Sequence, residues 1–274
     1  MKLRRVVGAI SVAVVLGLTA LYGSKARATS FSTDQSDLWW IPAESGWGMQ
    51  IVHQGSVLFA TMFVYDAAGK PTWYVATLDY GGLDSNDKNF WTGTLYATTG
   101  PWFGTVPFDP ATVTATPVGS MTFTAEFIET ASLTYSVDGV VVNKAITRQV
   151  LVYENFNGTF FGIYNQQVSG AGCPADANTA AAPLAATIAQ ADTAMTVTVL
   201  TGSTLTVTCT YSGVYSQVGH FGALDGNYTC SNGDFGSFVF YEMANSFYSL
   251  RARFSSTSAA TDCSSTGQIV GLRQ

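Results

Sequence analysis

Charged side chains are scarce in this sequence. Asp, Glu, Lys and Arg together make up 11% of its 274 residues, whereas about 25% is usual in a soluble domain. The 12 basic residues are also outnumbered by 18 acidic ones. Because nucleic acids and anionic lipids are bound through clustered Lys and Arg, we expect neither of them as a partner.

Histidine is also scarce, and the common catalytic motifs are missing. His53 and His220 are the two histidines, and they share no metal-ligand spacing with other His, Asp or Glu residues. The chain contains no G-x-S-x-G, H-E-x-x-H, P-loop or G-x-G-x-x-G pattern. Residues 84–87 and 225–227 resemble fragments of calcium loops but lack the distal Glu. We therefore predict no metal site and no cofactor.

Long apolar runs are missing too, except near the start of the chain. There, three basic residues precede an apolar run at residues 6–23, and Ala26 and Ala28 then form a small-x-small cleavage site. This order predicts a secretory signal peptide at residues 1–28, with a retained anchor as the alternative. No later run approaches the roughly 20 apolar residues of a membrane helix. We expect a secreted or periplasmic protein without membrane insertion.

Tryptophan and cysteine are confined to different parts of the chain. All six tryptophans lie between Trp39 and Trp102, and all four cysteines lie at or after Cys173. After cleavage, 246 residues remain, which is enough for one large or two small domains at roughly 150 residues each. We interpret residues 29–155 as an aromatic-rich domain and residues 156–274 as a domain stabilised by disulfides.

Short alternating runs separated by turn residues predict strands throughout both domains. An antiparallel meander of about eight strands exposes its edges unless it closes on itself. We therefore predict an all-β protein made of two antiparallel meander units, each a closed or nearly closed barrel of about eight strands. In the first unit, strands are expected at 47–53, 57–66, 71–80, 90–97, 121–128, 133–137 and 140–153, with room for an edge strand within 100–117.

One hairpin of the second domain has a register that the sequence itself indicates. A turn centred on Gly219 and His220 brings like residues face to face, and facing positions lie within disulfide reach. Four cysteines allow three pairings, and this register selects Cys209 with Cys230, which leaves Cys173 with Cys263. The facing pairs are Cys209 and Cys230, Tyr211 and Tyr228, Gly213 and Gly226, and Tyr215 and Leu224.

Two resemblances to known families accompany these patterns. The stretch W-W-x-P-x-E-S-G-W-G at residues 39–48, followed by F-x-Y-D-x-x-G-K-P-x-W at 63–73, resembles a family of exported bacterial proteins of unassigned function. That resemblance implies export and an all-β fold, and no catalytic residue. Trp40 before the first expected strand and Arg148 on the last resemble the Trp–Arg pair of lipocalin and avidin barrels, although the G-x-W motif of those barrels is absent. This likeness implies an arginine stacked over a tryptophan at one barrel end.

The aromatic-rich domain supplies the candidate ligand site. Two glycines in the E-S-G-W-G motif let the backbone approach a ligand, while Trp47 offers a stacking face and Glu44 accepts hydrogen bonds. Core filling is the alternative role of these rings. Trp91 and Trp102 flank a Gly- and Pro-rich stretch, so we expect these two to be exposed. The candidate ligand-binding residues are Trp40, Glu44, Trp47, Trp73, Trp91 and Trp102.

Three functions remain open on this basis. We favour an exported, non-catalytic protein that binds a glycan or a small amphipathic ligand. A hydrolase needs two carboxylates about 5 to 10 Å apart, for which Glu44 with Asp79, or Glu126 with Glu129, are candidates. An outer-membrane barrel is the third alternative, although it needs an apolar outer band. The oligomeric state does not follow from the sequence.

Overall fold

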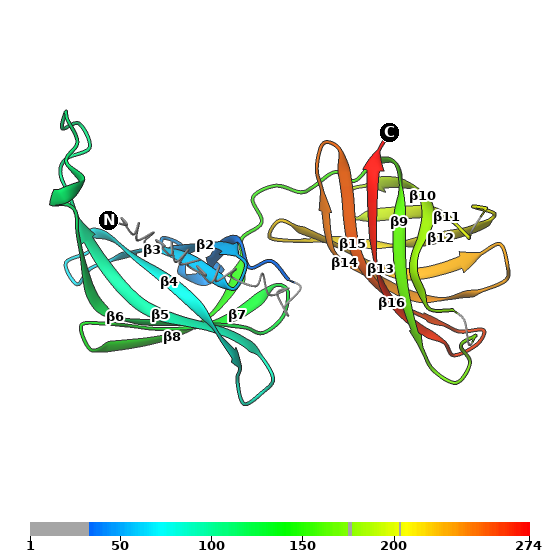
Figure 1. Ribbon diagram of the computed structural model, residues 1–274, viewed down its shortest axis with the longest axis horizontal. Helices are drawn as coiled ribbons and strands as arrows, with labels where there is room; N and C mark the ends of the chain where they lie inside the picture. Colours follow the sequence, from blue (N-terminus) through cyan, green and yellow to red (C-terminus); the bar gives the residue numbers. More distant parts are fainter. Residues whose placement is uncertain (1–32, 175–176, 203) are drawn as a thin grey trace, which may run out of the picture. The chain divides into compact units, whose positions relative to one another are not determined.

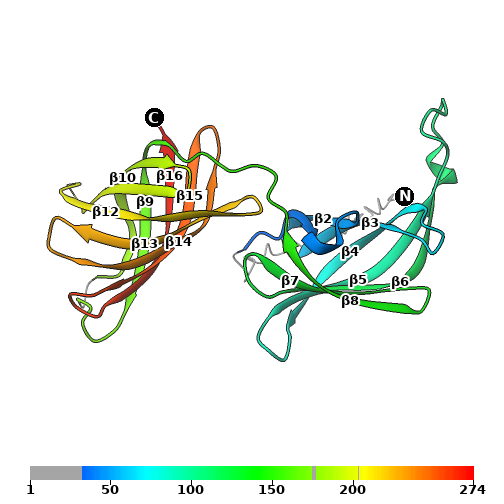
Figure 2. The ribbon, with the colours of Figure 1, turned by 180° about the vertical axis from the view of Figure 1, so that it is seen from behind.

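The computed structural model describes residues 33–174, 177–202 and 204–274. The predicted signal peptide at residues 1–28 lies outside these residues. Within them the backbone forms sixteen strands and two short 3-10 helices, Pro42–Glu44 and Pro110–Thr112, arranged as two closed antiparallel barrels (Figures 1 and 2). In the same part of the chain, no helix has the length and apolarity that crossing a membrane requires. The predicted all-β fold is confirmed.

The first barrel is an eight-stranded meander in which each strand pairs with its neighbours in sequence and the last pairs with the first. Its strands are β1 (Asp37–Trp40), β2 (Gly48–Gln54), β3 (Val57–Tyr65), β4 (Pro71–Leu83), β5 (Asn89–Thr99), β6 (Thr114–Ala125), β7 (Thr130–Val137) and β8 (Val140–Arg148).

Strand β1 was not among the expected strands, since the sequence placed the first one at residues 47–53. Four residues are too few to show a clear alternation, yet β1 closes the barrel. Trp39 lies opposite Met49 of β2 on one side and opposite Arg148 of β8 on the other. The two tryptophans at 39 and 40 are therefore part of the sheet rather than a lead-in to it.

The Trp–Arg pair exists, but it involves Trp39 instead of Trp40. The guanidinium carbon of Arg148 lies 4.6 Å from the centre of the Trp39 ring. Successive side chains of a strand point to opposite faces, so only one of the two neighbouring tryptophans can point inward. Trp39 is fully buried, whereas Trp40 is only partly buried.

Large side chains fill the interior of the first barrel. Trp39 and Trp91 both pack against Phe123, with ring centroids 5.1 and 6.1 Å apart. The expectation that Trp91 is exposed was wrong, because its position on β5 points inward and the side chain is completely buried. Other fully buried large side chains of this barrel include Met49, Ile51, Leu58, Met62, Leu78 and Leu95.

The second barrel repeats the architecture. It closes through pairing of its last strand with its first. Its strands are β9 (Gly158–Ser169), β10 (Thr179–Ala191), β11 (Ala194–Thr201), β12 (Val207–Val218), β13 (Phe221–Cys230), β14 (Phe235–Asn245), β15 (Ser249–Ser258) and β16 (Ser264–Arg273).

The register of the β12–β13 hairpin is confirmed. Cys209 lies opposite Cys230, and Tyr211 opposite Tyr228. Both predicted disulfides are present, Cys209–Cys230 and Cys173–Cys263. The described part of the chain contains no free cysteine. Paired cysteines of this kind form in an oxidising environment.

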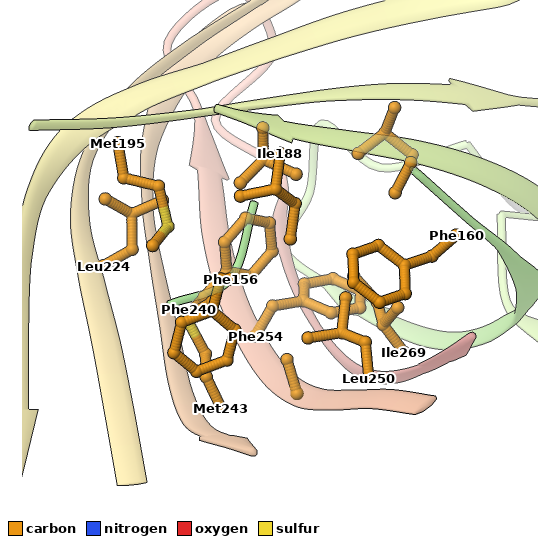
Figure 3. Packing of buried hydrophobic residues seen from close by; sticks show 14 of the residues in the cluster. Phe156, Phe160, Ile188, Met195, Leu224, Phe240, Met243, Leu250, Phe254 and Ile269 are labelled. Atoms are coloured by element: carbon orange, nitrogen blue, oxygen red, sulfur yellow. The ribbon is translucent and has the colours of Figure 1, made fainter. Parts of the chain in front are cut away.

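Aromatic and aliphatic side chains from all parts of the second barrel meet in its interior (Figure 3). Phe156, which precedes β9, and Phe160 are fully buried in this cluster. Phe240, Phe254 and Ile269 come from three successive strands and extend the cluster along the barrel. Beyond these residues the interior is hollow, and that space is the candidate site.

Candidate functional site

An open cavity of about 600 Å³ occupies one part of the second barrel. Ligand pockets of proteins commonly measure about 300 to 1,000 Å³, so the space suits a small organic molecule. Each of the eight strands contributes between one and three residues to its lining, and the connections between strands supply the remainder.

The inner side of the cavity is apolar. Phe240, Phe254, Leu184, Val199 and Ile269 line it and also belong to the buried core of the barrel. The rings of Phe240 and Phe254 lie 6.3 Å apart between centroids in that core, and Figure 3 labels both of them together with Ile269. A ligand that reaches this depth therefore meets hydrocarbon and aromatic rings.

Two stacked tyrosines form part of the wall. The rings of Tyr211 and Tyr228 lie 5.3 Å apart at an angle of 28°, as the hairpin register requires of facing residues. Tyr211 also contacts Phe240, at 5.1 Å between ring centroids. Burial raises the pKa of the Tyr211 phenol. Both rings are fixed by packing before any ligand arrives.

Asp234 provides the charge of the site. It follows the turn between β13 and β14, and its side chain accepts hydrogen bonds from the hydroxyls of Tyr228 (3.0 Å) and Ser258 (2.6 Å). Burial, with a further contribution from Asp234, raises the pKa of the Tyr228 phenol to about 12, so this hydroxyl remains a donor at neutral pH. Among the described residues that line the cavity, Asp234 is the one with a charged side chain.

The two disulfides frame this cavity. Cys209–Cys230 lies in the wall two residues along the strands from the stacked tyrosines. Cys173–Cys263 joins the segment after β9 to the β15–β16 turn. Cys263 itself lines the cavity, as does Pro174, the neighbour of Cys173. The two disulfides therefore constrain the residues around the cavity as well as the strands of the barrel.

The residues predicted as a ligand site lie elsewhere, and none of the six lines this cavity. Glu44 and Trp47 do come together, because the Trp47 indole donates to the Glu44 carboxylate at 2.9 Å. Lys144 contacts both, through an ion pair with Glu44 and at 4.8 Å from the Trp47 ring centre. Side-chain hydrogen bonds from Lys144 and Trp47 lower the pKa of the Glu44 carboxyl group. This is a small exposed cluster on the first barrel.

Trp73 and Trp102 are exposed but separate. Trp73 faces Phe63 across the β3–β4 hairpin, and the two residues are 51% and 43% exposed on the outside of the barrel. Trp102 is 69% exposed in the β5–β6 connection, which extends away from the first barrel in Figures 1 and 2. Trp40 lies opposite Thr147 on the outer face of β1.

The candidate carboxylate pairs do not line the cavity either. Glu126 accepts a hydrogen bond from Ser132, next to the turn that also contains Glu129. Asp79 lies on the exposed face of β4, away from the buried positions of that strand. Within the described ranges, no group of three or more His, Cys, Asp and Glu residues is arranged to hold a metal ion.

Comparison with protein-family models, with curated proteins and with solved structures found no match to this chain.

Proposed function

We propose that this is an exported, non-catalytic binding protein and that the cavity of the second barrel holds a small amphipathic ligand. One observation carries the proposal: a cavity of about 600 Å³ with an apolar interior and a polar mouth. Aromatic rings and a few well-placed polar groups are the usual lining of ligand sites. The signal peptide predicted at residues 1–28 and the two disulfides support export.

The lining favours binding over acid-base hydrolysis. Hydrolysis by paired acids requires a second carboxylate about 5 to 10 Å from the first. Asp234 has no such companion among the described lining residues, and its oxygens are engaged by Tyr228 and Ser258. Its hydrogen bonds hold the carboxylate in place, which suits recognition of a ligand.

A glycan contact on the first barrel is the second candidate function. Trp73 and Phe63 occupy directly opposite positions on adjacent strands, and about half of each residue is exposed. Aromatic rings on a sheet surface present the apolar faces that sugar rings contact. A glycan array probed with the protein and with Trp73→Ala tests this candidate, and equal signals from both proteins would dismiss it.

The cavity is tested with an uncharged solvatochromic dye. We expect the dye to bind with a blue-shifted emission, because it enters an apolar space. Ser265 lines the cavity, so Ser265→Trp should fill it and weaken binding by about tenfold or more, equal to at least about 1.4 kcal/mol. Thr266→Trp is the matched control, since its neighbour Thr266 is exposed and lies outside the lining. Absence of dye binding, or equal loss in both variants, contradicts the proposal.

A further inference from the structure

We infer that the ligand of the second barrel carries a cationic nitrogen group, either a protonated amine or a quaternary ammonium, which is bound by Asp234 and by the faces of the neighbouring tyrosines. This inference rests on the proposed binding function and names the chemical class of the ligand. It follows from the unbalanced negative charge of the cavity, from the aromatic rings that line it, and from the positions of the charge and the apolar residues along the barrel.

The charge of Asp234 is not balanced by the protein. Its side-chain partners, the hydroxyls of Tyr228 and Ser258, are neutral. The described lining residues include no Lys, Arg or His, and no ion pair of Asp234 occurs in the described chain. A carboxylate can accept about four hydrogen bonds, so acceptor capacity is left for a ligand. A negative charge in a concave, partly apolar site attracts a cation and repels an anion.

The aromatic rings beside Asp234 favour the same class of ligand. Tyr164, Tyr211, Tyr228, Phe240 and Phe254 all line the cavity. Cations bind over such rings within about 6 Å of the ring centre, and sites for quaternary ammonium groups use several rings at once. The hydrogen bond from Tyr228 to Asp234 joins the rings and the charge into one site.

The protein uses its own cations on rings elsewhere, but not here. Arg148 stacks on Trp39, Lys144 on Trp47 and Arg273 on Phe160. In the described chain, no Lys or Arg lies over any of the five rings of the cavity. The faces that border the open space are thus free for a cation that comes from outside.

The arrangement also orients the ligand. Asp234 lies at the hairpin turn between β13 and β14, at the mouth, whereas Phe240 and Ile269 lie toward the buried core. A ligand therefore binds with its amine near the turn and its hydrocarbon part inward. Fatty acids, phosphates and other anionic amphipaths would meet Asp234 without any basic partner, so the cavity selects against them.

The test compares three probes of equal chain length: an alkyl-trimethylammonium ion, its neutral isostere with carbon in place of nitrogen, and an alkyl carboxylate. Each displaces the uncharged dye in a titration. We expect the ammonium ion to bind at least about tenfold more tightly than the isostere, about 1.4 kcal/mol, and the carboxylate to bind most weakly. The ammonium preference should decline as salt is added.

Asp234→Asn removes the charge and keeps an oxygen that can accept the Tyr228 bond. It should abolish the preference for ammonium over the isostere while leaving dye affinity within about twofold. Asp225→Asn is the matched control, because Asp225 is an exposed residue of the neighbouring strand outside this lining. It changes the net charge equally and should keep the preference. A second pair of variants, Tyr211→Leu and Tyr211→Phe, tests the contribution of the aromatic ring. Tyr211→Phe keeps the ring and should keep ammonium binding, whereas Tyr211→Leu removes the ring and should weaken it.

The outcomes separate the two proposals. If the dye and the isostere bind but the ammonium ion gains nothing, or if Asp234→Asn retains the preference, the cation inference is wrong and the binding function stands. If neither the dye nor any probe binds, the proposed function itself is wrong. Should Asp234→Asn fail to fold, the probe series on the unmodified protein and the Tyr211 pair still decide the question.

Discussion

At the scale of single residues, Arg148 shows how one side chain completes a barrel. It is almost fully buried, stacks on Trp39 and donates to four oxygens around the barrel end besides the Asp37 carboxylate. The acceptors of its three guanidinium nitrogens are Ile128 O at 2.6 Å, Ser36 O at 3.3 Å, Asp37 Oδ2 at 2.9 Å, Asp34 O at 2.7 Å and Gln35 Oε1 at 3.1 Å. Only a planar guanidinium can supply donors in this fork geometry.

We therefore expect Arg148→Ala to lower the free energy of unfolding by about 3 to 5 kcal/mol, because it leaves Asp37 without its buried ionic partner and several acceptors unsatisfied. Arg148→Lys should lose most of that stability as well, since a single ammonium cannot reach all five acceptors. Denaturant unfolding followed by tryptophan fluorescence measures both. Lys70→Ala is the control, because Lys70 is an exposed loop residue. A loss below about 1 kcal/mol for Arg148→Ala, typical of an exposed pair, would contradict this assignment.

The sequence predicted the partner of Arg148 only in part. A tryptophan under an arginine was expected from the likeness to lipocalin and avidin barrels, but the choice between Trp39 and Trp40 depends on the phase of a four-residue strand. One position along a strand reverses the side that a residue faces. That phase is set by pairing with β2 and β8, and pairing is a property of the closed barrel.

At the scale of elements, the β12–β13 hairpin was predictable because its pairs are symmetric. Cys209 with Cys230 and Tyr211 with Tyr228 satisfy one register and no neighbouring one. β10, Thr179–Ala191, has no such symmetric pairs to indicate its register. Its alanines give no strand signal of their own, and the strand forms because β9 and β11 pair with it on both sides. Tertiary pairing overrides local propensity in such a segment.

The facing glycines of the same hairpin give an element-scale prediction. A Cβ atom on Gly226 would overlap the backbone oxygen of Ser212 on the paired strand. We expect Gly226→Val to lower the free energy of unfolding by about 1 to 3 kcal/mol, the usual effect of overpacking. Asn227→Val, one residue along and exposed, should change it by less than about 0.5 kcal/mol. Chemical unfolding followed by far-ultraviolet circular dichroism compares the two, and equal values would show that the close approach is not restrictive.

At the scale of the whole molecule, the two barrels share a topology and differ in how their interiors are used. Bulky rings such as Trp39 and Trp91 fill the first barrel, whereas Ser256, Ser258 and Ser265 of the second leave space beside its rings. The two barrels and the two disulfides were predictable from alternation, turns and cysteine positions. The location of the cavity was not, because aromatic content does not reveal whether a barrel is filled. Whether a barrel is filled depends on the total volume of its inward-facing side chains. Identifying those side chains requires the register of every strand.

A hollow interior forgoes packing contacts, so the second barrel, which contains both disulfides, should depend on them for much of its stability. The disulfides Cys173–Cys263 and Cys209–Cys230 join cysteines that are 90 and 21 residues apart in the sequence. On the chain-entropy model these stabilise the fold by about 5 and about 3 kcal/mol. Since all six tryptophans belong to the first barrel, tryptophan fluorescence reports on that barrel alone, and circular dichroism reports on both.

We expect the double variant Cys173→Ser with Cys263→Ser to unfold in two thermal transitions. An early one, seen by circular dichroism and by loss of dye binding, belongs to the second barrel, and a later one with unchanged midpoint appears in tryptophan fluorescence. The corresponding Cys209→Ser with Cys230→Ser variant should shift the early transition less, because its loop is shorter. The unmodified protein treated with reductant should behave like the variants combined. If the fluorescence midpoint falls together with the dichroism midpoint, the barrels unfold as one cooperative unit and the division of stabilising interactions between them is wrong.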